Sequence, residues 1–296
     1  MGKTLAIFVI IALFITGFST VNAGNPQNES AAQPDTLMVG MVPFHEAQVM
    51  IDSIDPLTEL LSEELNMPVE GTVLTSYTSV IEAMGTGRVD VGIFGPFALV
   101  LGEQRHNLQV ILTALRNGES HYEAQFVTRS DSEIENLNDV RDKTAAFVDP
   151  ASASGFLFPY VHMLDAGIDP ETDLDKYIYA GSHDAALLAV YNQEVDFKAG
   201  IDARGQVRDE VPDIDEKVEV FATSSAIPND GVAVRPELDD QLVDSIQQAF
   251  ITIGDTEEGQ ELLETLYLVT GFTTASRDKY DIVRRTYEKM EEYIEF

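Results

Sequence analysis

The chain has 296 residues, of which 51 are Asp or Glu and 18 are Lys or Arg, and its formal net charge is −33 at pH 7. This charge argues against nucleic acids and anionic membranes as partners, because their phosphates would be repelled. The absence of cysteine excludes disulfides, thiol catalysis and a lipid anchor on a cysteine. With 44% apolar residues the chain can bury a sizeable core, and chains of this length usually divide it between two lobes.

The first 23 residues have the pattern of a secretory signal peptide. Lys3 precedes an apolar run over residues 4–18, and small and polar residues follow up to Ala23. The run is shorter than the roughly 20 residues that a membrane span needs. We therefore expect cleavage after Ala23, a disordered tether over residues 24–35 and a free protein in the periplasm.

From residue 36 onward, short apolar runs alternate with longer segments of helical periodicity. This alternation is typical of an α/β protein whose sheets are covered by helices. Strand-like runs in the first part lie at 37–44, 69–75, 89–95, 108–114 and 122–128. A second set begins near residue 132, with strand-like runs at 144–148, 177–181, 195–200 and 217–224. After one more strand at 231–234 the pattern predicts helices only, over 237–252, 257–268 and 276–293.

The order of these elements predicts that the chain leaves one lobe and returns to it. We expect lobe 1 to contain residues 36–126 and 231–296, and lobe 2 to be inserted as residues 127–230. Hinge strands would lie near 124–130 and 225–234. A ligand would lie between the lobes, where such folds usually bind small molecules.

Patterns for metal, cofactor and nucleophilic chemistry are weak. The five histidines show no spacing of four, and the glycine-rich stretch 85–92 precedes a strand instead of following one, so neither a metal nor a dinucleotide is expected. A hydrolase remains an alternative, because Ser152 or Ser154, His183 and Asp184 or Asp230 are the residue types of a triad. The serine loop lacks the preceding glycine of a nucleophile elbow.

The stretch DPASASGF, residues 149–156, joins a strand to a helix. The first turn of a helix carries unpaired N–H groups and the positive end of the helix dipole, so this loop could hold an oxyanion without lysine or arginine. The alternative is that one serine only caps the helix. Ser182 and His183 begin another helix that could converge on the same point, or His183 could be a solvent-facing cap residue.

Three segments resemble the periplasmic substrate-binding proteins of phosphonate, phosphite and phosphate ABC importers. They are FVDPASASGFLFP at 147–159, GSHDAALLAVYNQEVD at 181–196 and YTSVIEAMGTGRVDVGIFGPFALVL at 77–101. The resemblance implies a type II periplasmic-binding fold, a clamshell of two α/β lobes joined by a two-strand hinge. It also implies a monomeric binding protein, not an enzyme, that closes on a tetrahedral phosphorus oxyanion and presents it to a membrane permease.

The same resemblance implies a set of ligand-binding residues. The loop positions that hold the oxyanion fall on Ser152, Ala153 and Ser154, and alanine here replaces a hydroxyl residue, which leaves only a backbone N–H. Tyr77 and Tyr122 would donate phenolic hydrogen bonds from the other lobe, or they are ordinary core aromatics. The histidine at the helix start falls on His183.

Two carboxylates complete the implied site. Asp202 could meet the amine of an aminoalkyl group, but its segment AGIDARG departs from the family pattern, and a helix cap or solvated acid is the alternative. Asp230, in SSAIPNDGVAV, could accept a proton from a singly protonated ligand. A bare carboxylate repels a dianion, so we expect Asp230 to select protonated oxyanions.

A binder of a sulfonate or another organic anion stays open as an alternative, because a fold does not fix its ligand.

Overall fold

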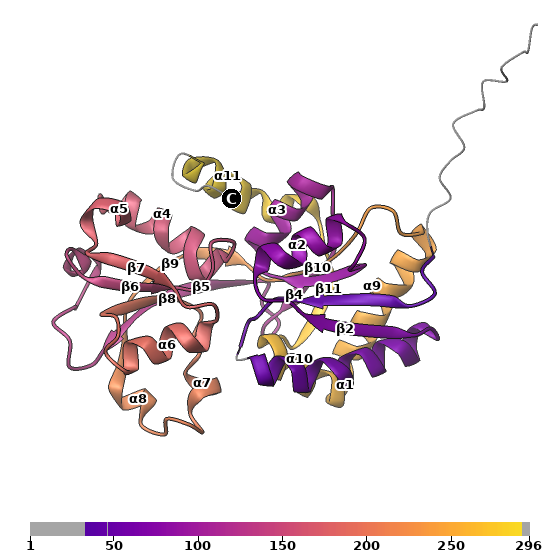
Figure 1. Ribbon diagram of the computed structural model, residues 1–296, viewed down its shortest axis with the longest axis horizontal. Coiled ribbons are helices and arrows are strands. Elements are labelled where there is room, and N and C mark those ends of the chain that lie inside the picture. The colour runs from indigo at the N-terminus through magenta and orange to yellow at the C-terminus, as the bar shows by residue number, and fades with distance from the viewer. Residues whose placement is uncertain (1–32, 46, 292–296) are drawn as a thin grey trace, which may run out of the picture. The chain divides into compact units, whose positions relative to one another are not determined.

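Two mixed β-sheets organise the protein in this computed structural model, which describes residues 33–45 and 47–291 (Figure 1). These residues belong to one compact unit. The predicted signal peptide and most of the predicted tether lie outside the described residues.

The first sheet has six strands in the order β11-β4-β10-β3-β1-β2. Strand β1 pairs in parallel with β2 and β3, whereas β10 runs antiparallel to both β3 and β4, and β11 runs antiparallel to β4. The strands are β1 (Leu37–Met41), β2 (Val69–Val73), β3 (Val91–Phe94), β4 (Gln109–Leu115), β10 (Gly231–Val234) and β11 (Gly271–Thr274).

Helices cover both faces of this sheet (Figure 1). Helices α1 (Ala47–Leu65), α9 (Asp240–Gly254) and α10 (Glu257–Tyr267) lie on one face, and α2 (Tyr77–Gly85) and α3 (Pro96–His106) lie on the other. Helix α11 (Asp281–Met290) follows the short helix η3 (Arg277–Tyr280) and packs against α3. Side-chain caps fix the first residues of several helices. At the start of α9, for example, the Asp239 carboxylate accepts the Gln241 N–H.

The prediction that only helices follow residue 234 is wrong, because β11 lies between α10 and η3. This strand has only four residues, two of them the β-branched Thr273 and Thr274, and it is stabilised by pairing with Leu112–Leu115 of β4. A four-residue edge strand is too short for its alternation to stand out from the flanking helices.

The second sheet has five strands in the order β7-β6-β8-β5-β9. They are β5 (His121–Arg129), β6 (Thr144–Phe147), β7 (Lys176–Tyr179), β8 (Phe197–Gly200) and β9 (Val218–Pro228). On one face lie the π-helical turn η2 (Ala153–Leu157) and helix α4 (Phe158–Asp165), and on the other lies α6 (His183–Tyr191) (Figure 1). Shorter helices fill the connections: η1 (Leu137–Val140), α5 (Pro170–Asp173), α7 (Arg204–Val207) and α8 (Ile214–Lys217).

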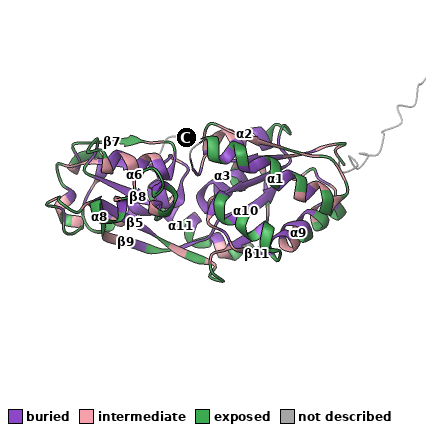
Figure 2. Ribbon diagram, turned by 90° about the horizontal axis from the view of Figure 1, so that it is seen from below, coloured by how far each residue is buried: buried purple, intermediate pink, exposed green. Residues whose placement is uncertain are grey.

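The chain crosses between the two sheets twice. It passes from β4 to β5 through a turn at residues 116–120, and it returns from β9 to β10 through Asn229 and Asp230. Strands β5 and β9 pair with each other along their length, which places these two crossings side by side. Figure 2 shows that buried residues gather in the strands and on the inward helix faces. Within the described residues, no helix combines the length and apolar character that crossing a membrane requires.

Candidate functional site

The loop before α4 is held by its own polar groups. The Asp149 carboxylate accepts the Ala151 N–H at 2.8 Å, and the Asp149 carbonyl accepts the Ser152 N–H at 2.9 Å. The Ser152 Oγ accepts the Gly155 N–H at 3.0 Å, so Ser152 caps the helix as the simpler prediction had it. The cap uses Ser152 as an acceptor, and its hydroxyl proton can still be donated to a ligand.

The helix after this loop begins with a π-helical turn, Ala153–Leu157, before it becomes α-helical. The Leu157 N–H donates to the Ser152 carbonyl at 3.0 Å, a bond that spans five residues. Gly155 is required in this turn, because a Cβ there would lie 2.4 Å from the Cβ of Val148. π-Helical turns occur frequently at functional sites. Ser152, Ala153 and Ser154 are each only 2% exposed at the start of this turn.

Two tyrosines meet this loop. Tyr122 on β5 has a side-chain hydrogen bond with Ser154, and its pKa is raised by burial and by the nearby Asp230 carboxylate. Tyr77 is the first residue of α2 and is 2% exposed. Burial, followed by the charges of Asp149 and Asp230, raises its pKa well above the ordinary value. Both phenols are therefore neutral hydrogen-bond donors at physiological pH.

Asp230 is paired with an arginine from the β4–β5 turn. The Arg116 guanidinium donates through Nη2 to the Asp230 carboxylate, and the two side chains are 14% and 5% exposed. Arg116 also donates to the Asn229 side chain and to the Tyr267 carbonyl, each at 3.1 Å. Its guanidinium carbon lies 4.9 Å from the centre of the Tyr122 ring. Arg116 thus joins the turn, α10 and Asp230.

His183 starts α6 and is 1% exposed, so the alternative of a solvent-facing cap residue is wrong. The backbone N–H of His183 donates to the Phe44 carbonyl at 3.3 Å. The Oγ of the neighbouring Ser182 caps the helix by accepting the Ala185 N–H. Burial, followed by the nearby Lys198 charge, lowers the His183 pKa well below 6.5, which keeps the ring neutral. Among the described residues, its Nδ1 has no hydrogen-bond partner.

A second contact joins the segment after β1 to α6. His45 Nδ1 lies 3.1 Å from the Asp184 carboxylate, and both side chains are buried. The Phe44 ring packs against two other rings: it is tilted to that of His183, with 5.1 Å between centres, and edge-on to that of Tyr267, with 5.2 Å. The segment 44–45 and the start of α6 are therefore connected by a backbone hydrogen bond, a side-chain hydrogen bond and an aromatic contact.

Lys198 on β8 is fully buried beneath His183. Its ammonium donates to the Ile201 carbonyl at 2.5 Å, and burial lowers its pKa to about 8. Gly200 separates it from His183: a Cβ at Gly200 would lie 2.7 Å from His183 Nδ1 and 3.6 Å from Lys198 Nζ. The glycine therefore leaves the space in which these two side chains approach each other.

Asp202 lies apart from the other predicted residues. Its carboxylate accepts the backbone N–H of Arg204 at 3.1 Å and the Arg204 guanidinium at 2.6 and 2.9 Å. Its side chain is 40% exposed. Asp202 thus closes a local turn just before α7, whose N-cap residue is Ala203, and the neighbouring arginine neutralises its charge.

The structure thus brings predicted site residues from distant segments together, whereas Asp202 is paired with its neighbour Arg204. Tyr77, Tyr122 and Asp230 share one neighbourhood with Ser154, and His183 is close enough to Arg116 for the arginine to act on its pKa. Two cations that were not predicted, Arg116 and Lys198, also lie close to these residues. Neither residue was predicted from the sequence. Arg116 directly precedes the turn NGESHY, which contains the predicted site residue Tyr122, and this position could have indicated it.

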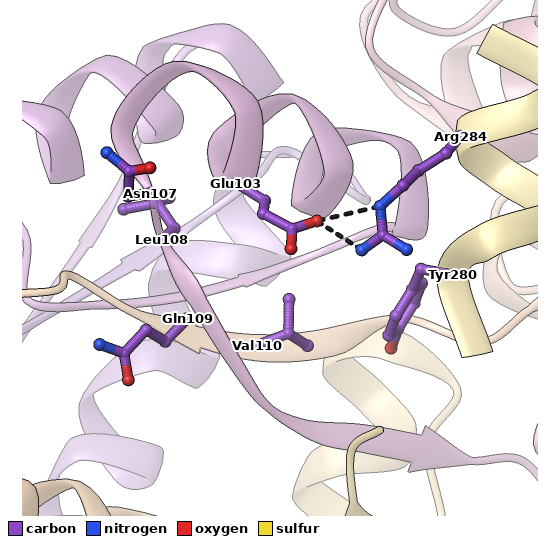
Figure 3. A pocket seen from close by; sticks show the side chains of 7 residues that line it. All are labelled: Glu103, Asn107, Leu108, Gln109, Val110, Tyr280 and Arg284. Atoms are coloured by element: carbon purple, nitrogen blue, oxygen red, sulfur yellow. Dashed lines mark hydrogen bonds and ion pairs between the residues drawn. The ribbon is translucent and has the colours of Figure 1, made fainter. Parts of the chain in front are cut away.

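Two further features lie outside this group. A pocket of about 380 Å³ between α3, β4 and α11 is lined by Glu103, Asn107, Tyr280 and Arg284, and its Glu103–Arg284 pair closes one side (Figure 3). None of the predicted site residues lines it. Over residues 33–45 and 47–291, no group of three or more His, Asp or Glu side chains could hold a metal ion.

The fold is that of periplasmic binding proteins of type II, as predicted. The structure matches PhnD1 from Prochlorococcus marinus, solved in complex with methylphosphonate, with a TM-score of 0.79 and 18% identity over 88% of this chain and 99% of that chain. At this identity the match shows the fold.

Sequence comparison then gives the family. The model of the family described as "ABC transporter, phosphonate, periplasmic substrate-binding protein" matches residues 39–280, and this protein belongs to that family. It is 25% identical to the phosphonates-binding periplasmic protein of Escherichia coli over 87% of this chain and 78% of that protein. It is 32% identical to the phosphate-import protein PhnD of Mycolicibacterium smegmatis over 58% of this chain, and that match spans 57% of the relative's length.

Proposed function

We propose that this protein captures a phosphorus oxyanion, namely phosphite, a phosphonate or phosphate, in the periplasm and delivers it to the permease of an ABC importer. The protein would act as a monomer, and the ligand would leave chemically unchanged. Lobe 1 would comprise residues 36–126 and 231–296, and lobe 2 residues 127–230, with the ligand held by groups from both.

The observation that carries this proposal is the meeting of buried donors from distant segments. The hydroxyl of Ser154 meets the phenol of Tyr122, and the neutral ring of His183 lies near the guanidinium of Arg116. Buried donors without full partners bind an anion well, because its oxygens remove the cost of leaving those donors unsatisfied and the low dielectric strengthens the new hydrogen bonds. The start of a helix adds the positive end of its dipole.

The ligands of the relatives support a phosphorus ligand. The Escherichia coli relative is a phosphonates-binding protein, the Mycolicibacterium smegmatis relative is a phosphate-import protein, and the Prochlorococcus marinus structure holds methylphosphonate. These ligands share a tetrahedral phosphorus with three or more oxygens. A site that binds this shared group is consistent with all three names.

A serine hydrolase fits the loop less well. Ser152 caps the helix through Gly155, and Ser154 is bonded to Tyr122. In the part of the chain that the structure describes, neither serine has a hydrogen bond to a histidine, which a serine nucleophile needs as its base.

Calorimetric titration tests the proposal. Phosphite, methylphosphonate and phosphate are added separately, with methanesulfonate and taurine as anions that lack phosphorus. We expect at least one phosphorus ligand to bind at least about tenfold more tightly than either sulfonate, a difference of about 1.4 kcal/mol. Tighter binding of a sulfonate, or no heat with any phosphorus ligand, would refute the assignment.

Substitution of Ser154 tests the site itself. Ser154→Ala removes one buried donor, and we expect the Kd of the best phosphorus ligand to rise about tenfold, as for the loss of one hydrogen bond to a charged group. Ser245→Ala is the matched control, because Ser245 is an exposed serine on α9 whose Oγ donates to the Gln241 carbonyl. Equal affinity of the two variants would exclude Ser154 from the site.

A further inference from the structure

The Arg116–Asp230 pair changes the charge that a ligand would meet. From the sequence alone, Asp230 is a bare carboxylate that should favour singly protonated ligands. In the structure a guanidinium donates directly to it, and both side chains are largely buried. A paired guanidinium cancels the field of the carboxylate at short range, so the repulsion of a doubly charged ligand is removed.

Several of the remaining polar groups around this pair are donors, although the Asp149 carboxylate also lies by Tyr77. Tyr122 and Ser154 carry hydroxyl protons, and His183 is a neutral ring that can donate one N–H. Arg116 itself has a donor to spare: its Nε is buried and, within the described residues, has no hydrogen-bond partner. A fully ionised phosphoryl or phosphonyl group has only acceptors, and it matches such a set better than a protonated group does.

We propose that Arg116 is a specificity-determining residue that neutralises Asp230 and makes the site one for doubly charged phosphorus oxyanions. This inference rests on the proposed function and narrows it from phosphorus oxyanions in general to their fully ionised form. It predicts that the ligand is taken up with both acidic protons lost, as a phosphonate or phosphate dianion.

The pH dependence of ligand binding tests this proposal. Other titratable groups near the Arg116–Asp230 pair also change binding with pH, and their contribution has to be measured separately. The titratable or charged groups that act on Arg116 or Asp230, or lie beside the donors, are His45, Tyr77, Tyr122, Asp149, His183, Lys198, Tyr267 and Tyr280. Of these, Lys198 has a pKa of about 8 and would weaken the binding of any anion as it loses its proton. Methanesulfonate, which has the shape of methylphosphonate but keeps a single charge, reports this background.

The experiment measures the Kd of methylphosphonate and of methanesulfonate by calorimetry from about pH 6 upward, where phosphoryl groups lose their second proton. If only the dianion binds, the ratio of the methylphosphonate Kd to the methanesulfonate Kd falls about tenfold per pH unit below the ligand's second pKa, because the binding-competent fraction rises tenfold. A ratio that rises with pH would overturn the proposal.

Substitutions at Arg116 show whether this residue causes the pH dependence of the Kd ratio. Arg116→Met leaves a bare Asp230, and the ratio should then rise with pH. The double variant Arg116→Met with Asp230→Asn removes both charges and should give weaker binding with little dependence on pH. Arg116→Lys keeps the positive charge, so the ratio of the two Kd values should still fall as the pH rises, as in the natural chain. If Arg116→Met keeps that direction too, Arg116 does not set the preference.

The control is Arg235→Met. The Arg235 guanidinium donates to the Asp90 carboxylate at 2.7 Å, and the side chains are 12% and 7% exposed. It is a similarly buried pair, next to strands β10 and β3 of the first sheet. This variant should keep the pH profile of the natural chain. The two proposals fail differently: no binding of any phosphorus ligand refutes the function, whereas tight binding with the opposite pH profile refutes only the role of Arg116.

Discussion

Asp202 and Asp230 are the two acids of the predicted site, and their surroundings differ. Asp202 pairs with Arg204, two residues along the chain, and its side chain is 40% exposed. Asp230 pairs with Arg116, which is 114 residues away, and its side chain is 5% exposed. A local pair on the surface fixes a turn. A buried pair between distant segments fixes the position of a charge in a site.

Breaking the buried pair should have the largest effect. Arg116→Met leaves the Asp230 carboxylate buried without its cation, and we expect the free energy of unfolding to fall by about 3–5 kcal/mol. Urea unfolding followed by circular dichroism measures this loss. The double variant with Asp230→Asn should recover part of it. If Arg116→Met unfolds at the urea concentration of the natural chain, the pair does not stabilise the fold.

Lys198 sharpens the comparison, because it is a buried cation whose direct partner is a carbonyl instead of a carboxylate. Burial lowers its pKa from 10.5 to about 8. Between these values the native state has lost the proton and the unfolded state still holds it, so stability rises as the pH rises from about 8. Up to pH 10, where buried tyrosines begin to act in the opposite direction, the gain should be about 2–3 kcal/mol.

Lys198→Met is the reference for that measurement. The variant has no proton to lose at this position, and its unfolding free energy should stay level from about pH 8 to pH 10. The same rise in both proteins would show that Lys198 is not its source.

Asp202→Asn should have the smallest effect. A partly exposed ion pair contributes less than about 1 kcal/mol, because water and salt screen it. We expect ligand affinity to change by less than about twofold, since Asp202 is turned toward Arg204. A loss of affinity of tenfold or more would place Asp202 in the site after all.

These two acids also show how far the sequence predicts the site. The turn closed by Asp202 can be predicted from the local segment DAR, where an aspartate precedes an arginine by two residues. The caps formed by Ser152 and Ser182 are equally local, because each serine bonds an N–H three residues on. Such features depend on neighbours in the chain, and the pattern of residue types is enough to predict them.

Arg116 could not be predicted in this way. Its partners Asn229, Asp230 and Tyr267 are more than a hundred residues away, and they meet only when two chain crossings and α10 come together. The strands that carry these crossings were predicted, but their pairing depends on the packing of the whole chain. The short strand β11 escaped for a related reason, since four residues carry little periodicity of their own.

The contacts of Phe44 and His45 with α6 bear on the residence time of a bound ligand. Ser152, Ser154 and His183 are almost completely buried, so a ligand held by them cannot leave until neighbouring segments separate. The His183 N–H bond to the Phe44 carbonyl and the His45–Asp184 pair both have to open for α6 to move away from the segment after β1. The dissociation rate is then limited by bonds that need not touch the ligand at all.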